Sequence, residues 1–390
     1  MLNVLTLSSL FPDATRPNFG IFVERQTAAL AMRPGIAVRV VAPIGLPVWP
    51  LARSARFRAQ AALPLREEWA GLDVSRPRFM TIPGTAGRFH VPALVRALTP
   101  VLDRLRDEAR FDVIDASFFF PDGPAAVALG RRYGVPVSIK ARGADIHLWG
   151  HAPATRHQVA RAAMRADGLL AVSDAMADDV AALGVSRHRI RVHHTGVDQS
   201  RFQPIDREAA KQALGVTGPL VVSLGALIPR KGHGVVIDAV ARLPGVTLMI
   251  VGEGAERAAL TARAERAGVA DRVRLIGAIP HAELPPLLGA ADVMALASAS
   301  EGLANAWVES LACGTPVVIT PAGGAEDVVT SRVAGRIAQA DPGEFAAAIR
   351  DVLEQAVDPW AVRAAVRDFT WPANAAGLHS HLAELVARGR

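Results

Sequence analysis

Short apolar runs alternate with longer amphipathic stretches along the first half of the chain. The apolar runs have the length of buried strands and cover residues 3–7, 37–42, 113–114, 136–139, 168–172 and 190–193. Amphipathic stretches such as 23–31 and 93–110 lie between them and predict helices. This alternation is typical of parallel βαβ units.

The second half begins the same pattern again. Its apolar runs predict strands at 220–224, 247–251, 272–276, 293–296 and 315–319. Helices are predicted near 234–243, 255–267, 283–290, 304–313 and 343–355. Two such runs, separated by a turn-rich segment near 196–204, predict an α/β protein of two Rossmann-like domains. Functional residues are then expected in the loops just after strands.

The composition is that of a globular protein. Apolar residues make up 51% of the 390 residues and charged residues 21%, which excludes a disordered or collagen-like chain. The single cysteine, Cys313, excludes a disulfide scaffold and a cysteine-built zinc site. The first residues lack the basic region of a secretory signal, and no uncharged apolar run reaches the roughly 18 residues of a membrane span. We therefore expect a cytoplasmic protein.

The charge is unevenly distributed. Residues 1–200 hold 25 Lys and Arg against 17 Asp and Glu, whereas residues 201–390 hold 18 against 20, which together give the net charge of +6. A basic half predicts contact with an anionic surface or substrate. The sequence has no RNP-like aromatic motif, zinc finger or lysine-rich arm, so we expect no nucleic acid partner. An anionic membrane or a phosphate-bearing acceptor fits better.

The segment 300–318 contains two glutamates, Glu301 and Glu309, around a predicted helix start. Eight residues are about two helical turns, so both carboxylates can face the same side. The amides of Gly302, Leu303 and Asn305 would open the helix and form an anion site, and a carboxylate nearby can accept two ribose hydroxyls. The alternative is an exposed helix with two solvated glutamates.

A second candidate is the loop from Gly225 to His233, which follows a predicted strand and carries Arg230 and Lys231. A guanidinium and an ammonium side by side suit a diphosphate. The alternative is a basic surface loop.

Two loops of the first half also follow predicted strands. Gly20 would let the backbone approach a ligand while its amide starts a helix. Arg142 and Asp145, within the segment 140–147, offer charge beside a glycine.

Several motifs of other enzyme classes are absent. The segment 251–257 begins like a dinucleotide fingerprint but has Arg257 in place of the third glycine, and no Walker, zincin or serine-hydrolase motif occurs. His193 and His194 have no acidic partner at metal-binding spacing, so a structural role is expected for them.

Taken together, these motifs resemble the retaining, nucleotide-sugar-dependent GT-B glycosyltransferases of group 1, family 4. The residues that carry the resemblance are Gly20-Ile21-Phe22-Val23 with Arg25-Gln26, Pro121-Asp122-Gly123, Arg142-Gly143-Ala144-Asp145, Thr195-Gly196-Val197-Asp198, Arg230-Lys231-Gly232, and Glu301 to Glu309 with the following Ala312 to Val318. The last motif is highly specific, and the resemblance covers essentially the whole chain.

The resemblance implies two Rossmann-like domains that face a central cleft. An acceptor-binding domain would comprise residues 1–196 with a C-terminal helix, 371–390, that crosses back to it, and a donor-binding domain would comprise 197–370. Arg230, Lys231 and Glu301 would be catalytic, with the two cations on the donor diphosphate. Glu309 would hold the ribose.

Further donor contacts would come from Gly225 and from the loop Gly302, Leu303 and Asn305, with Gly20 closing over the phosphates. Arg142 and Asp145 would lie on the acceptor side. Arg142 stands where many members have histidine, and Gly20 is single where many have paired glycines.

The implied reaction transfers a hexose from a UDP- or GDP-sugar to a polysaccharide or lipid-linked glycan, with retention of anomeric configuration, in the synthesis of cell-envelope polysaccharide. No cofactor and no divalent metal are expected, because the Arg-Lys pair does the electrostatic work of a metal. The alternatives are a sugar-nucleotide epimerase of the same fold, which product analysis would reveal, and a non-catalytic two-lobed sugar-binding protein, which would release sugar without turnover.

Residues 47–66 combine five large apolar side chains with four arginines and no acidic residue. A basic amphipathic stretch of this kind can lie on anionic lipid, which would make the protein peripheral on the inner face of the plasma membrane. The alternative is a helix that packs on its own sheet with a solvated basic face.

Overall fold

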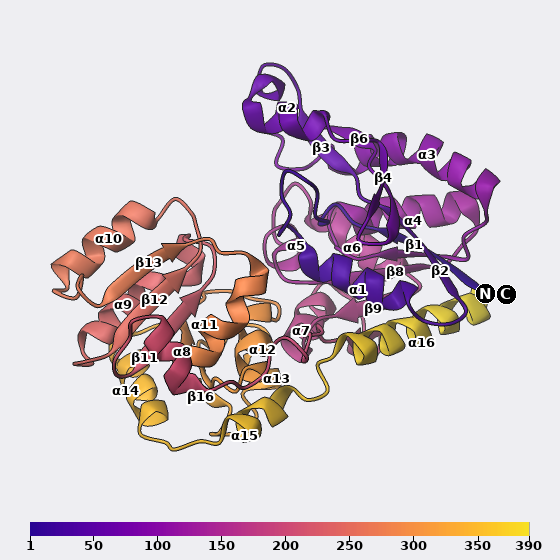
Figure 1. Ribbon diagram of the computed structural model, residues 1–390. Helices are drawn as coiled ribbons and strands as arrows, with labels where there is room; N and C mark the ends of the chain where they lie inside the picture. Colours follow the sequence, from indigo (N-terminus) through magenta and orange to yellow (C-terminus); the bar gives the residue numbers. More distant parts are fainter. Residues whose placement is uncertain (390) are drawn as a thin grey trace. The chain divides into compact units, whose positions relative to one another are not determined.

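The computed structural model describes residues 1–389, which form two compact α/β units (Figure 1). Unit 1 comprises Met1–Gly196 and the C-terminal segment from Trp371 onward, and unit 2 comprises Val197–Thr370. Each unit has its own largely parallel sheet with helices packed against it. The predicted α/β class with two Rossmann-like domains is confirmed.

The main sheet of unit 1 has eight strands in the order β10-β9-β8-β7-β1-β2-β5-β4. The strands are β1 Leu2–Leu7, β2 Ile36–Val41, β4 Arg66–Trp69, β5 Leu72–Ser75, β7 Val113–Ala116, β8 Val137–Ala141, β9 Gly168–Ala171 and β10 Ile190–Val192. All pairs are parallel except the edge pair β4 and β5. The central strands β7, β8 and β9 are buried along their whole length, as expected for parallel strands covered on both faces.

Four strands of unit 1 were not predicted. Besides β4 and β5, they are β3 Ile44–Pro47 and β6 Arg78–Thr81, which form a separate two-stranded parallel sheet. β4 reads Arg-Glu-Glu-Trp, so it has no apolar run, and its residues alternate between exposed and half-buried. An edge strand of this composition cannot be recognised from hydrophobicity alone.

The helices of unit 1 are α1 Ile21–Ala31, α2 Ala55–Ala61, α3 His90–Glu108, α4 Asp122–Tyr133, α5 Ala144–His147, α6 Arg156–Arg165, α7 Asp174–Ala181 and α16 Trp371–Gly389, with short 3₁₀ turns η1 Leu51–Arg53 and η2 Arg187–Arg189. The C-terminal helix α16 packs against α1, and the two run side by side in Figure 1. Its buried Leu378 and Leu382 join Val4, Leu30 and Val113 in one apolar cluster.

The sheet of unit 2 has six parallel strands in the order β13-β12-β11-β14-β15-β16. The strands are β11 Leu220–Leu224, β12 Thr247–Val251, β13 Val273–Gly277, β14 Val293–Leu296, β15 Val317–Ile319 and β16 Gly335–Ile337. The first five lie within the predicted runs or extend one residue past them, whereas the three-residue β16 was missed.

The helices of unit 2 are α8 Arg207–Ala213, α9 His233–Ala241, α10 Arg257–Arg266, α11 Leu284–Ala290, α12 Asn305–Ala312, α13 Ala325–Val328, α14 Pro342–Leu353 and α15 Pro359–Arg363, with 3₁₀ turns η3 Pro229–Lys231, η4 His281–Glu283 and η5 Ala364–Val366. A large apolar cluster joins α9 and α14 to the central strands.

Strand order reverses once in each main sheet. In unit 2 the chain leaves β11 for β12 on one side and later returns to β14 on the other. In unit 1 it leaves β1 for β2 and later returns to β7 on the other side. Open α/β sheets bind ligands beyond the carboxyl ends of the two strands that flank such a reversal. Each unit therefore has one favoured ligand position of its own.

Candidate donor site in unit 2

The predicted donor-binding residues gather mainly in two loops of unit 2. One loop, residues 225–232, follows β11, and the other, residues 297–304, follows β14. β11 and β14 are paired neighbours, and strand order reverses between them. Both loops therefore lie at the favoured ligand position of this sheet.

Arg230, Lys231 and Glu301 come together in one charged group, which we call the Arg-Lys-Glu cluster. The Lys231 ammonium lies 2.5 Å from Glu301 Oε1, and Arg230 Nη1 lies 3.6 Å from Glu301 Oε2. Arg230 also donates to the Ser300 carbonyl, and the Ala299 amide donates to the Arg230 carbonyl at 2.8 Å. These bonds tie the two loops together, so the three residues predicted to be catalytic are neighbours.

The cluster keeps one unbalanced positive charge, because two cations share one carboxylate. The Arg230 side chain is 43% exposed, whereas those of Lys231 and Glu301 are 16% and 9% exposed. A lysine has three N–H donors and an arginine has five, so one bond to Glu301 and one to Ser300 leave most donors unused. This arrangement suits an anion with several oxygens, such as a diphosphate.

Two glycines shape the loop that carries the cations. A Cβ on Gly225 would lie 3.3 Å from the Lys231 side chain, so the lysine stem packs directly over this residue. Gly232 has a positive φ of 67°, and a Cβ there would collide with the Ala297 carbonyl. A side chain at position 232 would therefore push the two loops apart.

The helical spacing argument for Glu301 and Glu309 is wrong. Helix α12 begins at Asn305, so Glu301 lies in the preceding loop and only Glu309 is on the helix. The chain is extended at the N-cap Ala304, which breaks the regular rotation that the argument assumed. No side chain caps this N-terminus. The Trp307 amide donates to the Ala304 carbonyl, which leaves the amides of Asn305 and Ala306 for an anion.

The loop between Glu301 and α12 is fixed by its neighbours. The Gly324 amide donates to the Gly302 carbonyl at 2.7 Å. Gly323 has a positive φ of 54°, and a Cβ there would collide with the Glu301 and Gly302 carbonyls. Leu303 is buried, with 8% exposure, and anchors the loop to the domain. The loop is thus held in place before any ligand binds.

Glu309 has a partner that the sequence reasoning missed. The carboxylate Oε1 lies 2.7 Å from His281 Nε2, and both side chains are largely buried. His281 begins the 3₁₀ turn η4 after β13, and its ring packs edge-on against Phe202 at 5.3 Å. Its place after a strand was the signal that could have drawn attention to it.

His233 lies buried directly after the loop that carries Arg230 and Lys231. It is fully buried at the start of α9, and its Nδ1 lies 2.9 Å from Ser223 Oγ. Burial lowers the pKa of His233 to about 4, although the carbonyls of Ala226 and Gly225 favour the protonated form. The ring is therefore neutral at physiological pH and adds no charge to the site.

Gly20 is required by the close approach of another part of the backbone. It is the N-cap of α1 with a positive φ of 73°, and a Cβ there would collide with the Leu10 carbonyl and lie 2.9 Å from the Phe11 amide. The space that glycine provides is filled by the chain itself, so the expectation that it makes room for a ligand does not explain the residue.

Arg142 lies at the carboxyl end of β8 and is bound on several sides. Its Nε donates to the Ser117 carbonyl at 2.6 Å, its Nη2 donates to Gln26 Oε1 at 3.1 Å, and the guanidinium stacks on Phe22 at 5.0 Å. Burial lowers the pKa of Arg142 to about 10, so it stays charged at neutral pH. The side chain is only partly buried.

Asp145 does not face an acceptor. It is fully buried, and its carboxylate accepts the amides of Phe119 at 2.9 Å, Gly143 at 2.7 Å and Arg142 at 3.0 Å. The acceptor-side prediction for Asp145 therefore needs correction: the carboxylate orders the loop that carries Arg142.

Residues 47–66 contain the 3₁₀ turn η1 and the short helix α2, and many of their side chains are exposed. After β3 come η1 and the short helix α2, which stand at the tip of unit 1 in Figure 1. Trp49, Leu51 and Leu65 are 71%, 50% and 68% exposed. Helix α2 itself packs against β3, buries Gln60 and leaves Arg56 and Arg58 exposed, as the alternative of a helix on its own sheet expects.

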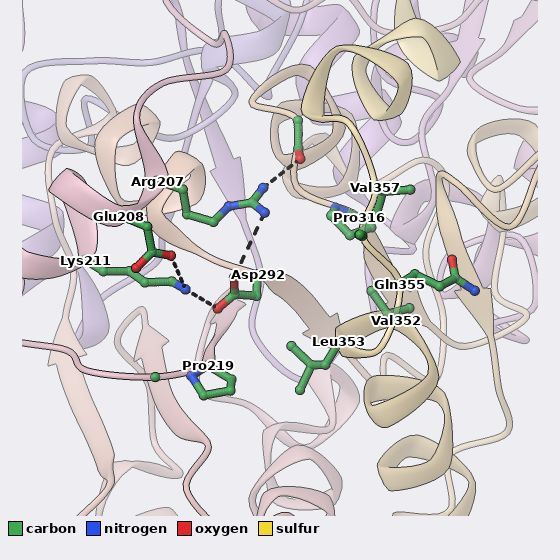
Figure 2. Close-up of a pocket in the computed structure, with 13 residues that line it drawn as sticks. Arg207, Glu208, Lys211, Pro219, Asp292, Pro316, Val352, Leu353, Gln355 and Val357 are labelled. Carbon is green, nitrogen blue, oxygen red and sulfur yellow. Dashed lines mark hydrogen bonds and ion pairs between the residues drawn. The ribbon is translucent and has the colours of Figure 1, made fainter.

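A cavity of unit 2 lies away from the Arg-Lys-Glu cluster. It measures about 380 Å³ and lies at the amino ends of the strands, beside Pro219, Asp292 and Pro316 (Figure 2). Its charges are paired with one another: the Lys211 ammonium lies 2.9 Å from Asp292 and 3.1 Å from Glu208. Arg207 also lies 4.0 Å from Asp292 and donates to the Gly314 carbonyl. We interpret this group as structural, because its two cations face two carboxylates.

Metal-ligand clusters and membrane-spanning helices are both absent from residues 1–389. Across this range, no three His, Cys, Asp or Glu side chains are grouped so as to hold a metal ion. None of the helices in the same range combines the length and the apolar character that a membrane crossing needs.

Two family models match the chain in succession. The model described as Glycosyltransferase Family 4 matches residues 21–201, and the model described as Glycosyl transferases group 1 matches residues 204–366. The chain belongs to the group 1 glycosyltransferases, which is a family of transferases. The predicted family is confirmed.

Among curated proteins, the chain is similar to the D-inositol 3-phosphate glycosyltransferases of Mycobacterium bovis and Mycobacterium tuberculosis. The identity is 36% over 203 residues, which is 50% of this chain. The match covers 42% of the length of each of these relatives, so the chain spans less than half of their length.

Solved structures share the fold along almost the whole chain. Sucrose-phosphate synthase from Thermosynechococcus elongatus superposes with a TM-score of 0.80 at 20% identity and full coverage of both chains. HepE from Anabaena, solved with UDP-glucose, superposes with a TM-score of 0.74 at 22% identity, covering 98% of this chain and 100% of that one. The GT-B fold is therefore shared with these proteins.

Proposed function

We propose that this protein transfers a hexose from a UDP- or GDP-sugar to a polysaccharide or lipid-linked glycan acceptor, with retention of anomeric configuration. The observation that carries the proposal is the Arg-Lys-Glu cluster at the carboxyl ends of β11 and β14. Family membership and the resemblance to HepE, which was solved with UDP-glucose, support a nucleotide sugar as the donor.

In the proposed reaction, the bond between the sugar C1 and the diphosphate oxygen breaks, and its electron pair leaves with the diphosphate. Lys231 and Arg230 neutralise the growing negative charge with donors that are already in place. The acceptor hydroxyl attacks C1 from the face that the diphosphate leaves and passes its proton to a diphosphate oxygen. Attack from this face retains the configuration at C1.

Other residues of unit 2 would orient the donor. His281 bonds Oε1 of Glu309, so Oε2 and the second lone pair of Oε1 can accept the two ribose hydroxyls. The uncapped amides at the start of α12 would bind a phosphate oxygen. Glu301, next to Lys231, would accept a hydroxyl of the donor hexose.

We propose that the reaction needs no divalent metal. The net positive charge of the cluster takes the electrostatic place that a metal holds in other transferases. Activity should therefore survive in excess EDTA, and loss of activity with recovery on adding Mg²⁺ would overturn this part of the proposal.

The test is a transfer assay on the full chain. UDP-glucose, UDP-galactose and GDP-mannose are offered with octyl glycoside acceptors, and the release of nucleoside diphosphate is compared with and without acceptor. We expect acceptor-dependent release with one donor, and the anomeric coupling in the product reports retention. An isomerised donor without transfer would instead show an epimerase. Failure of all three donors to react would contradict the proposal.

A further inference from the structure

Unit 1 has a cavity of about 230 Å³ at its own favoured ligand position. Ser9 and Arg16, from the loop after β1, and Phe118 and Phe120, from the loop after β7, line it. β1 and β7 are the neighbouring strands between which strand order reverses. The cavity thus lies where an open α/β sheet binds small molecules.

Aromatic rings form much of its wall. Phe120 lies 5.1 Å from Trp149 and 6.3 Å from His90 between ring centroids, and Phe79 meets His90 edge-on at 6.2 Å. The faces of aromatic rings carry partial negative charge, so they attract C–H groups, which are weakly positive. Such a wall favours a ligand with a face of C–H groups.

The wall is held rigidly. Gly87 has a positive φ of 81°, and a Cβ there would lie only 2.7 Å from the Trp149 ring. The Thr155 hydroxyl donates to the Trp149 carbonyl at 2.6 Å, so both the ring and the backbone of this tryptophan are fixed. A site fixed in advance binds a ligand with a smaller loss of conformational entropy.

Polar groups of the cavity point to a ligand with hydroxyls. Gln60 is the only buried residue of α2, at 2% exposure, and within residues 1–389 its side-chain amide has no hydrogen-bond partner. Covering this amide with a hydrocarbon would leave it buried and unsatisfied, which costs free energy. A hydroxyl of the ligand would satisfy it.

Two more polar groups line the same cavity. The Ser9 hydroxyl donates to Asp122 Oδ2 at 3.1 Å and can still accept a hydrogen bond. Burial lowers the pKa of His90, so its ring is neutral at physiological pH and offers one donor and one acceptor. Amide, hydroxyl and imidazole together can bond several hydroxyls of one ligand.

The cavity has no free cation to hold an anion. Its one lining cation, Arg16, is paired with the buried Asp13 through two hydrogen bonds of 2.7 and 3.1 Å. The guanidinium also stacks on Phe19 at 4.3 Å. The ligand is therefore expected to be uncharged at the part that enters the cavity.

We propose that this cavity binds the terminal sugar of the acceptor as a single neutral six-membered ring, with its C–H face against Trp149 and Phe120 and its hydroxyls on Gln60 and His90. The inference rests on the proposed function, which requires a sugar acceptor. The volume of about 230 Å³ lies below the roughly 300–1,000 Å³ of sites for drug-sized ligands, so one ring fits and a longer chain would extend outside.

The test is saturation-transfer NMR on the full chain without nucleotide. The probes are methyl α-glucopyranoside, methyl α-mannopyranoside, methyl α-galactopyranoside, myo-inositol and glucose 6-phosphate. Trp149→Leu removes the aromatic face, and Gln60→Leu removes the amide at nearly constant volume. The matched control is Trp360→Leu in α15, where the tryptophan is 58% exposed.

We expect at least one neutral ring to bind, with the affinity at least about tenfold lower in Trp149→Leu and Gln60→Leu and unchanged in Trp360→Leu. The inference is overturned if no neutral ring binds the wild-type protein, if only the phosphorylated ring binds, or if both cavity variants bind as the wild type does. Should Trp149→Leu fail to fold, Gln60→Leu decides.

A parallel titration with UDP and GDP separates this inference from the proposed function. Nucleotide binding should be equal in the wild type, Trp149→Leu and Gln60→Leu. If nucleotides bind but no neutral ring does, the inference fails alone. If rings bind but neither nucleotide does, the cavity remains a sugar site and the proposed donor chemistry fails.

Discussion

Lys231 is the residue on which the donor chemistry depends most. Its side chain is largely enclosed, with 16% exposure, and its ammonium lies 2.5 Å from Glu301, beside the position that we assign to the diphosphate. The Arg230 side chain is more exposed, so solvent weakens its electrostatic attraction to an anion. Of the two cations, Lys231 should therefore contribute more to the stabilisation of the transition state.

Replacing Lys231 by Ala should lower the turnover of sugar transfer by about 10²-fold or more, because a charge-assisted contact to the leaving diphosphate is lost. Initial rates at saturating donor measure this effect. The matched control is Arg350→Ala, which removes an exposed cation of α14 in the same unit. Equal turnover of Lys231→Ala and wild type would remove Lys231 from the mechanism.

Asp122 gives a prediction on pH and stability. Burial raises the pKa of Asp122 to about 7, and the nearby Asp145 charge adds to this effect, although bonds from Ser9 oppose it. The folded protein then keeps a proton that the unfolded chain releases near pH 4, so stability falls as the pH rises from about 4 to 7.

The substitution Asp122→Asn should reduce this fall, because the amide cannot ionise. Urea unfolding at pH 5 and pH 8 measures the difference in unfolding free energy, with the exposed Asp271→Asn as control. An equal fall in the wild type and Asp122→Asn would contradict the assignment.

Single residues of the site differ in how far the sequence could predict them. Arg230, Lys231 and Glu301 stand out because charged residues directly after buried strands are unusual. Asp145 has the same sequence signature but is buried under backbone amides, which only the folded loop reveals. His281 was missed because its partner Glu309 is 28 residues away.

Elements with a continuous apolar pattern were predicted well, and those without one were not. The buried strands β7, β8, β9 and β14 read as apolar runs. The strands β3 to β6 are four residues each. β3 pairs with β6 and β5 pairs with β2, which are distant in the sequence, and β4 is an edge strand without an apolar run. Local patterns do not contain that information.

Helix α16 stabilises unit 1 through its apolar side. Leu382 is fully buried beside Val4 and Leu30. Leu382→Ala should lower the free energy of unfolding by about 2–5 kcal/mol through the cavity it leaves. Urea denaturation measures it against Arg388→Ala, an exposed change in the same helix. A loss of the same size in both variants would show that Leu382 has no such role.

The projection formed by η1 and α2 should bind anionic membranes. Trp49 and Leu65 are exposed, and so are Arg53, Arg56 and Arg58 of the same segment, residues 47–66. We expect co-sedimentation with vesicles that contain phosphatidylserine, weakened by salt, because each basic residue contributes about 1 kcal/mol near such a surface.

The double substitution Trp49→Ser with Leu65→Ser should weaken this binding further, whereas Trp360→Ser in unit 2 should not. Equal binding to neutral and anionic vesicles would contradict the electrostatic preference for anionic lipid, and no binding to either would rule the membrane contact out.

The two units share one arrangement of strands. Each is a largely parallel sheet with one reversal of strand order, and each places distinctive side chains at that reversal: cations in unit 2 and aromatic rings in unit 1. The sequence could predict two Rossmann-like domains because the βα pattern starts twice. It could not predict the aromatic cavity, because its walls come from seven separate segments of the chain.

The most direct test of the donor site is a calorimetric comparison of nucleoside diphosphates with the corresponding nucleosides. UDP or GDP should bind the wild-type protein at least about tenfold more tightly than uridine or guanosine, since the diphosphate meets two cations. In the double variant Arg230→Ala with Lys231→Ala, this preference should disappear while nucleoside binding persists. An undiminished preference in the double variant would contradict the assignment of the diphosphate to this cluster.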